Sequence, residues 1–270
     1  EIIGDGSQET YTIPVTITQP SITAETLKAK LFHDTLARTA TNLDEGNAPR
    51  TNNIRLAAKA INGTILNPGD EFSYNGTVGE RTAARGYQEA HAYSGGKIID
   101  EFGGGVCQPS STLYMAVLRA DLKVTERHNH SFTVSYTPLG EDATVDYGNL
   151  DFRFVNNTAY PVKILAEQTD GQMIMTIVGT KTSDKTVTTR TEVLETYKPE
   201  TVTKTDSSME GQADKPAWRP RASRATATKT YKQITENGKD GPRCWPTDPP
   251  IPSGMRSFTS VNNKKRRIYE

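Results

Sequence analysis

Apolar residues recur every three to four positions in three parts of the chain, the spacing that buries one face of an α-helix. Residues 21–36 carry leucines at this spacing, and residues 52–61 carry isoleucines and alanines. The third part follows a run of glycines, where Leu113, Val117 and Leu118 share one face. The pattern therefore predicts three helices.

Elsewhere apolar and polar residues alternate with a period of two, which is typical of half-buried strands. Strands are predicted at residues 11–17, 71–74, 133–136, 144–147, 151–155, 161–166 and 173–178. Asn156-Asn157 and Asp170-Gly171 are typical hairpin turns. A few helices segregated from many consecutive strands predict an α+β fold with a largely antiparallel sheet, followed by an extended or disordered C-terminal tail.

Composition divides the chain at its C-terminal end. From Gly211 onward 13 basic residues accompany 5 acidic ones, a net charge of +8, so the preceding 210 residues carry −8. Seven of the 15 prolines also follow Gly211, which disfavours a regular sheet there. We expect a main domain over residues 21–180, a linker and small β module over 181–240, and a mostly disordered basic tail over 241–270.

Cys107 lies where the run Gly103-Gly104-Gly105 turns into the third predicted helix. Glycines permit close approach of a substrate to the backbone, and Pro109 fits the first helical turn. The positive end of a helix favours a thiolate over a thiol, so Cys107 is a candidate nucleophile. The alternative is a small buried side chain that only packs. The other cysteine, Cys244, falls in a segment with an independent pattern, and we expect both thiols to be free.

Two of the four histidines, His128 and His130, follow the cysteine helix within a predicted strand and would share one face. Either imidazole can accept the proton of Cys107, and Asp142 or Asp146 can orient the ring through its other nitrogen. Two histidines and a cysteine also suit zinc, but no fourth ligand has recognisable spacing, so we expect neither a metal nor a cofactor.

From about Asn52 to Gly179 the chain resembles the VanW domain family, which is named after an accessory protein of vancomycin-resistance clusters. The resemblance rests on matching stretches throughout this region, and the glycine-cysteine and His-Asn-His elements are the most specific of them. The stretches are residues 53–54, 60–64, 68–75, 78–79, 81–82, 86–87, 103–114, 126–131, 134–136, 142–145 and 150–154. Residues after Lys181 resemble, more weakly, a degraded G5 module, a small extended β unit that often follows VanW domains.

The resemblance implies a peptidoglycan L,D-transpeptidase that uses Cys107 as nucleophile, since some VanW-domain proteins have this activity. On chemical grounds we add His128 or His130 as the base, Asp142 as its orienting carboxylate, and backbone N–H groups of residues 106–108 as donors to the oxyanion. Arg81 or Arg127 would pair with a carboxylate of the peptide stem. The substrate-binding residues are predicted to be Gly104, Gly105, Val106, Gln108, Ser110, Arg81, Arg127 and Tyr114.

The family context also predicts where the protein acts. VanW domains commonly follow a membrane anchor and peptidoglycan-binding-like domains, so residues 1–20 are interpreted as the last strand of such a domain. The protein is then expected on the outer face of a Gram-positive bacterium, bound to peptidoglycan stems. The basic tail suits anionic wall polymers, and without interleaved aromatic residues it does not indicate nucleic-acid binding. The alternative functions are a wall-binding module without catalysis and a hydrolase that passes the thioester to water.

Overall fold

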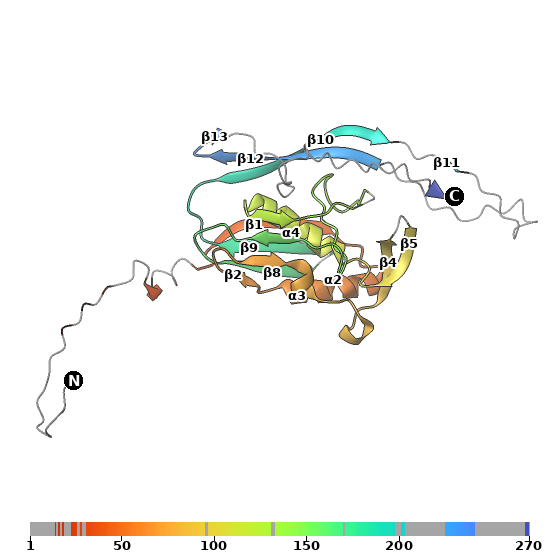
Figure 1. Cartoon of the computed structure of the whole chain (residues 1–270), viewed down its shortest axis with the longest axis horizontal. Coiled ribbons are helices and arrows are strands. Elements are labelled where there is room, and N and C mark those ends of the chain that lie inside the picture. The colour runs from red at the N-terminus through yellow and green to blue at the C-terminus, as the bar shows by residue number, and fades with distance from the viewer. Residues whose placement is uncertain are drawn as a thin grey trace, which may run out of the picture.

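The structure is a computed structural model that describes residues 14, 16, 18, 23–25, 28, 31–94, 97–130, 133–169, 171–197, 201–202, 225–240 and 268–269. Its described part combines helices with several small, mainly antiparallel sheets, so the predicted α+β class is confirmed (Figure 1). No helix in these residues is both long and apolar enough to cross a membrane.

The largest sheet has four strands in the order β1-β9-β8-β2, and every neighbouring pair is antiparallel. These strands are β1 (Asp34–Asn42), β9 (Gln172–Gly179), β8 (Val162–Thr169) and β2 (Ile65–Leu66). Met173, Met175 and Ile177 of β9 alternate into the core and are completely buried. The sheet therefore joins the beginning of the main domain to its end.

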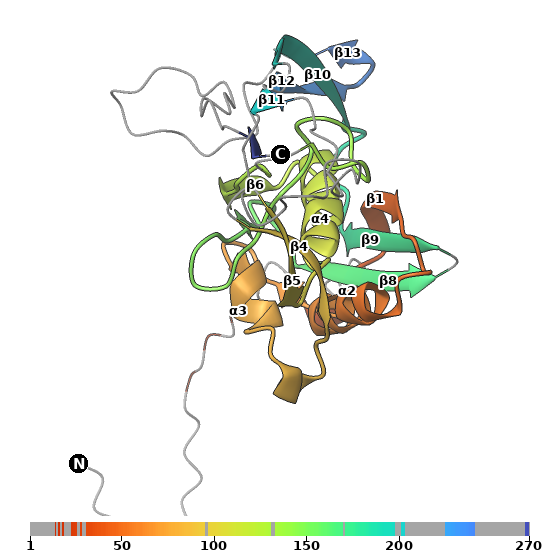
Figure 2. The same cartoon turned by 90° about the vertical axis from the view of Figure 1, so that its right-hand side faces the viewer.

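Two helices pack on this sheet: α2 (Ala48–Ile61) contacts β8, and α4 (Cys107–Arg119) contacts β1 and β9. In α2 the Asn47 side chain caps the first turn by accepting from the N–H of Arg50. Almost all of α4 is buried, because it is enclosed by strands on several sides (Figure 2). A helix buried in this way holds its first residue, Cys107, in a defined position.

Two smaller strand groups flank the start of α4. The first is a three-stranded sheet of β3 (Glu71–Ser73), β7 (Arg153–Val155) and β6 (Lys123–Glu126). Along the chain, β3 is followed by α3 (Tyr74–Val78) and then by the 3-10 turn η1 (Ala83–Arg85). The second is the hairpin of β4 (Glu89–Ser94) and β5 (Lys97–Phe102), which runs directly into the glycine turn.

After the main sheet the chain forms a long two-stranded unit, here called the ribbon, of β10 (Thr186–Tyr197) and β12 (Ala225–Glu236) with the short β13 (Lys239–Asp240). A further pair joins β11 (Thr201–Val202) to β14 (Ile268–Tyr269). The ribbon lies over α4 in both views (Figures 1 and 2). The turn between β12 and β13 is Asn237-Gly238, and both residues have positive φ.

Several predicted elements are found and others are not. The predicted helices at 52–61 and after Cys107 and the predicted strands at 71–74, 151–155, 161–166 and 173–178 match elements of the structure. The predicted helix over 21–36 is wrong from Asp34, where β1 begins, because pairing with β9 overrides leucine spacing. Residues 133–136 and 144–147 form no strand; Thr144 and Asp146 make single bridges only.

Two more differences concern connections. Asn156 does not turn a hairpin: its buried side chain donates to Leu66 O and Tyr160 O, and β7 and β8 belong to different sheets. The segment expected to begin as a linker instead contains β10, whose threonines and valines favour extended backbone. The predicted strand at 11–17 and the tail at 241–270 lie outside the described residues, apart from residues 14, 16 and 268–269.

Candidate active site

The glycine turn before α4 is tightly packed. Gly103 and Gly105 have φ of +86° and +104°, values that side chains rarely adopt. A Cβ on Gly104 would lie 2.2 Å from the carbonyl oxygen of Ala90 in β4, and one on Gly105 would lie 2.7 Å from Arg50 Cγ. The turn therefore requires glycine because strand and side chain pack against it, and it delivers Cys107 as the first residue of α4.

The backbone donors of this turn differ from the prediction. Val106 N donates to Gly103 O at 3.1 Å, and Gln108 N donates to Gly105 O at 3.0 Å. These two N–H groups close the turn on itself and are not free to hold an oxyanion, whereas the N–H of Cys107, the third predicted donor, stays a prediction. The carbonyl of Val106 is also used, since it accepts from the Tyr74 hydroxyl at 2.7 Å.

The Cys107 thiol is free and partly exposed. Its Sγ lies 3.5 Å from Val145 O and 3.6 Å from Thr144 Oγ1. The segment that carries these two residues is held in place by a hydrogen bond of 2.8 Å from Thr144 N to His128 O. Cys107 therefore faces a backbone segment that lies more than thirty residues further along the chain.

His130 stands between Cys107 and Asp142. Its ring interacts with the thiol and changes the pKa of Cys107, and its Nδ1 lies 2.7 Å from Asp142 Oδ2. The same carboxylate oxygen accepts from His130 N at 2.7 Å. Asp142 therefore fixes both the ring and the backbone of His130, and the side chains of both residues are about nine-tenths buried.

The charges at this site favour an ion pair. Burial by itself would raise the pKa of Cys107, but the hydrogen bond and charge of His130 outweigh it, and the pKa is lowered. For His130 burial opposes protonation, whereas Asp142 and Cys107 raise the pKa to about 9. The pKa of Asp142 is lowered against the effect of its burial by His130 and Arg127. These charges therefore favour a thiolate beside an imidazolium beside a carboxylate.

Arg127 belongs to this arrangement rather than to a substrate. Its Nη2 donates to Asp142 Oδ1 at 3.0 Å and its Nε donates to Asp142 O at 2.7 Å. The side chain is only 5% exposed and lies over the ring of Tyr114. The prediction that Arg127 pairs with a substrate carboxylate is therefore wrong, because the carboxylate it binds is Asp142.

Sequence reasoning missed Tyr136, whose hydroxyl lies 3.4 Å from His130 Nε2. Burial raises the pKa of Tyr136 well above its usual value, and the negative charge of Cys107 adds to the effect. The hydroxyl therefore stays protonated and can donate. In the sequence it belongs to an alternating pattern, which assigned it to a strand, and to one of the stretches that resemble the VanW family.

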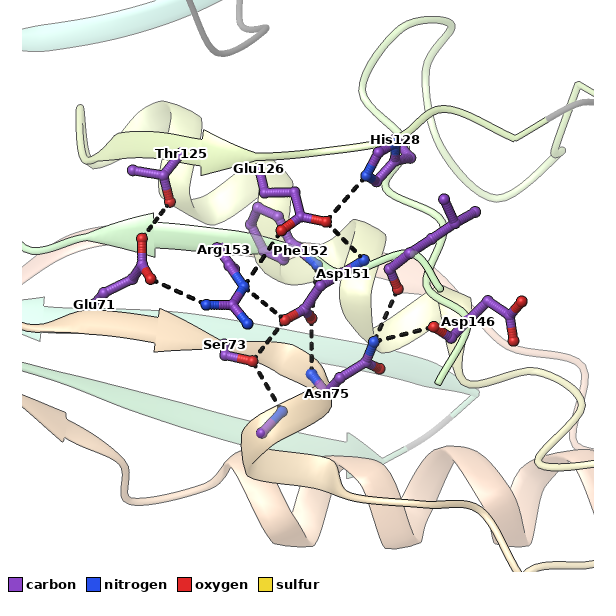
Figure 3. Close-up of polar contacts among 12 residues, drawn as sticks. Glu71, Ser73, Asn75, Thr125, Glu126, His128, Asp146, Asp151, Phe152 and Arg153 are labelled. Atoms are coloured by element: carbon purple, nitrogen blue, oxygen red, sulfur yellow. Dashed lines mark hydrogen bonds and ion pairs between the residues drawn. The ribbon is translucent and has the colours of Figure 1, made fainter. Parts of the chain in front are cut away.

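His128 lies in a different cluster. Its Nε2 is 3.1 Å from Glu126 Oε1, and Glu126 also contacts Arg153 (Figure 3). Arg153 in turn binds Asp151 and Glu71. His128 and His130 do not share a face, because the chain beyond β6 is not a strand. Of the two predicted histidines, the structure brings only His130 to Cys107, and it pairs that ring with Asp142 rather than Asp146.

Three of the predicted substrate-binding residues are core residues. Tyr114 and Ser110 are completely buried, and Gln108 is 1% exposed. The Gln108 amide donates to Thr41 Oγ1 and to Asn42 O, tying α4 to β1. Helical spacing could not reveal this, because α4 is enclosed on several sides and has no solvent face for these residues.

Arg81 does lie beside the glycine turn. A Cβ on Gly103 would be 2.6 Å from Arg81 Cβ, and the guanidinium lies over the rings of Tyr74 and Tyr147 at 5.6 and 5.7 Å. Its Nη1 donates to Asn75 Oδ1, while Nε and Nη2 are buried without a hydrogen-bond partner in the described part of the chain. Tyr147, by contrast, is 51% exposed.

The predicted alternative of a zinc site has no matching cluster of ligands among the described residues. Among the described residues no group of three or more His, Cys, Asp or Glu side chains is arranged to hold a metal ion. His128 and His130 bind separate carboxylates, Glu126 and Asp142.

Comparison with known proteins identifies the domain. The family model described as "VanW like protein" matches residues 49–178. The chain is 40% identical over 158 residues to "Uncharacterized protein YoaR" of Bacillus subtilis strain 168, covering 58% of this chain and 52% of that protein. It is 29% identical over 134 residues to "Vancomycin B-type resistance protein VanW" of Enterococcus faecalis, covering 48% of this chain and 49% of that protein.

The chain thus spans about half the length of each of these curated relatives. No solved structure matches it significantly. The matched region contains Cys107, His130 and Asp142 together with the glycine turn. Through residues 49–178, this chain belongs to the VanW-like protein family.

Proposed function

We propose that this protein is a cysteine acyltransferase of the cell wall, an L,D-transpeptidase that forms 3→3 crosslinks between peptidoglycan stems. The observation that supports the proposal is the arrangement of Cys107, His130 and Asp142, in which a thiol, an imidazole and a carboxylate interact in sequence. This is the combination of nucleophile, base and orienting group on which acyl transfer by cysteine depends.

In the first step the Cys107 thiolate attacks the carbonyl carbon of the third residue of a tetrapeptide stem, and a C–S bond forms. The imidazolium of His130 then gives its proton to the departing nitrogen as the C–N bond breaks. The terminal D-alanine leaves as an amine, and the stem remains on Cys107 as a thioester. Because the pKa of His130 is raised to about 9, the ring holds this proton at neutral pH.

The oxyanion needs a donor other than the N–H groups of Val106 and Gln108. The Tyr136 hydroxyl, within reach of His130 Nε2, is our candidate, and Thr144 Oγ1 at 3.6 Å from Sγ is the second. A buried hydroxyl that cannot ionise is well suited to stabilise charge that develops only in the transition state.

In the second step an amine of a neighbouring stem attacks the thioester. The neutral His130 accepts the proton of that amine, the new C–N bond forms and the C–S bond breaks. Thiolate and imidazolium are thereby restored, and no redox partner or metal is required. Water in place of the amine would give hydrolysis by the same route.

We assign the terminal carboxylate of the donor stem to Arg81. Its Nε and Nη2 have no hydrogen-bond partner among the described residues, and a guanidinium fork matches a carboxylate in geometry and charge. The Tyr147 ring, which covers the guanidinium and is half exposed, would have to move aside. In a donor stem that ends one residue after the attacked carbonyl, the terminal carboxylate would bind Arg81 while Cys107 attacks the carbonyl.

We further propose that the protein acts outside the cytoplasm at the cell wall of a Gram-positive bacterium. The name of the Enterococcus relative, a vancomycin resistance protein, agrees with such a place of action. The basic C-terminal segment would add attraction to anionic wall polymers, because opposite charges bring the two together before specific contacts form.

The test is incubation of the purified protein with tetrapeptide muropeptides, followed by mass spectrometry. Wild-type protein should produce dimers together with free D-alanine, and a thioester adduct on Cys107 should be trapped at early times. Cys107→Ala should produce neither, while His128→Gln should resemble wild type. Tripeptide without dimer would mean hydrolysis. Binding of muropeptides without any product would refute the enzyme and leave a wall-binding module.

A further inference from the structure

The ribbon contacts the loop that carries Asp142. This loop, residues 138–143, passes between α4 and β10 and is called the Asp142 loop here. Thr191 Oγ1 of β10 donates to Leu139 O at 2.8 Å. Thr189 Oγ1 donates to Glu141 Oε1, and Arg119 of α4 donates to Glu141 Oε2 at 2.9 Å. The buried carboxylate of Glu141 thus binds the helix and the ribbon together.

The second strand of the ribbon touches the backbone of the same loop. Gly140 has φ of +77°, and a Cβ there would lie 2.1 Å from Thr230 Oγ1 and 3.2 Å from Thr228 Oγ1. Thr228 and Thr230 are both more than nine-tenths buried. With the ribbon packed against the loop, position 140 therefore has no room for a side chain and requires glycine.

The position of the loop determines the position of the catalytic carboxylate. Arg127 Nη2 donates to Gly140 O at 3.4 Å and to Asp142 Oδ1 at 3.0 Å. Asp142 Oδ2 binds His130, and Ala143 N donates to Ser111 Oγ on α4 at 3.0 Å. A shift at Gly140 is therefore passed to Arg127 and Asp142, and from Asp142 to the imidazole.

A separate contact fixes the ribbon to α4. Lys185, just before β10, and Lys232 of β12 both form ion pairs with Asp121, which follows the C-terminal end of α4. Cys107 lies at the other end of the same helix. The ribbon is thus joined both to the element that carries the nucleophile and to the loop that carries Asp142.

We infer that the ribbon is part of the active site and that Gly140, Glu141 and Thr191 are positioning residues for Asp142. This inference rests on the proposed function. It extends that function beyond residues 49–178, the part matched by the family model, to residues 186–236. The catalytic geometry of the VanW-like domain then depends on a β unit that follows it in the chain.

The test compares glycine variants in the full chain, with Cys244→Ser so that only Cys107 reports. Gly140→Ala should move the pH midpoint of Cys107 alkylation upward. It should also lower kcat for crosslinking by about 10- to 100-fold with little change in KM, because small misplacements of catalytic groups have effects of this size. The double variant Gly140→Ala/Thr230→Ala should recover most of the lost kcat, because Thr230→Ala removes the hydroxyl oxygen that lies 2.1 Å from the new Cβ.

Gly63→Ala is the matched control. Its φ of +87° imposes similar backbone strain, but a Cβ there meets nothing within 4 Å. This variant should keep the wild-type midpoint and kcat. Thr191→Val, which removes the hydrogen bonds of this hydroxyl to Leu139 O and to Thr230 Oγ1, should shift both readouts in the same direction as Gly140→Ala and decides the question if Gly140→Ala fails to fold.

The alkylation midpoint is measured without substrate, so it tests the role of the ribbon independently of the proposed crosslinking reaction. A wild-type protein that alkylates at low pH but makes no crosslink would refute the proposed reaction, and a shift in Gly140→Ala would still support the ribbon's role. A folded Gly140→Ala, or Thr191→Val in its place, with the wild-type midpoint and kcat would overturn the inference. Equal effects of Gly63→Ala and Gly140→Ala would overturn it as well.

Discussion

Replacing Asp142 by asparagine tests the electrostatic part of the mechanism. The substitution keeps the shape of the side chain and an acceptor for His130 N, but it removes the negative charge that faces His130 Nδ1 at 2.7 Å. The imidazolium then loses its orienting partner. We expect the proton of His130, and with it the thiolate of Cys107, to become less stable at neutral pH.

The size of the effect follows from the pKa of His130. It stands at about 9, compared with 6.5 for an ordinary histidine, a difference that corresponds to about 3 kcal/mol at 1.36 kcal/mol per pKa unit. The hydrogen bond to Asp142 is the largest contribution that raises it. Without the charge we expect the pKa of His130 to fall from about 9 and crosslinking to slow by about 10²- to 10⁴-fold, the usual range for general acid–base catalysis.

The assay is the rate of Cys107 alkylation by iodoacetamide between pH 4 and 10, in a Cys244→Ser background, beside the rate of dimer formation. Glu126→Gln is the control, because Glu126 stands beside the other histidine, His128. Asp142→Asn also removes the ion pair between Asp142 and Arg127, so the melting temperature should fall and both rates must be measured well below it.

Two results would refute the reasoning. A folded Asp142→Asn protein with the wild-type alkylation midpoint would show that Asp142 does not control the thiol. An equal shift in Glu126→Gln would show that the effect is a general response to lost negative charge rather than a property of the site.

The remaining predictions concern pH, Tyr136 and Arg81. Crosslinking should be bell-shaped in pH: the thiolate is lost as pH falls through the lowered pKa of Cys107, and the proton donor is lost as pH rises through about 9, the pKa of His130. A rate still rising at pH 10 would contradict this assignment. Tyr136→Phe should lower kcat by about 10²- to 10³-fold without changing the alkylation midpoint by much, and an unchanged kcat would exclude the hydroxyl as the oxyanion donor. Arg81→Gln should raise KM for tetrapeptide donors by about tenfold or more and leave alkylation unchanged, since one charge-assisted hydrogen bond is worth about 1.5–3 kcal/mol; equal KM values would place the carboxylate elsewhere.

Much of the framework could be inferred from local pattern. The helix that begins at Cys107 and the strands β7, β8 and β9 follow from hydrophobic spacing, because each buries one regular set of side chains. The identity of the candidate nucleophile also needed no coordinates. A thiol after three glycines at the start of a helix is unusual enough to be noticed in the chain itself.

The choice between His128 and His130 lay beyond the sequence. The two rings are two residues apart, and only the irregular path of the backbone after β6 directs one to Glu126 and the other to Asp142. The functions of Arg127 and Tyr136 were hidden for the same reason. Their partners are brought near by loops whose course depends on long-range hydrogen bonds rather than on residue type.

The sequence alone determined the fold class, the family and the candidate nucleophile, because these depend on periodicity and on residues that are neighbours in the chain. Tertiary structure decided which histidine meets the thiol, which predicted arginine binds Asp142 and what supports Asp142. Those answers depend on contacts between segments far apart in the chain, such as Gly140 with Thr230 and Cys107 with Val145. Local propensity carries no information about them, since each is set by the packing of whole elements.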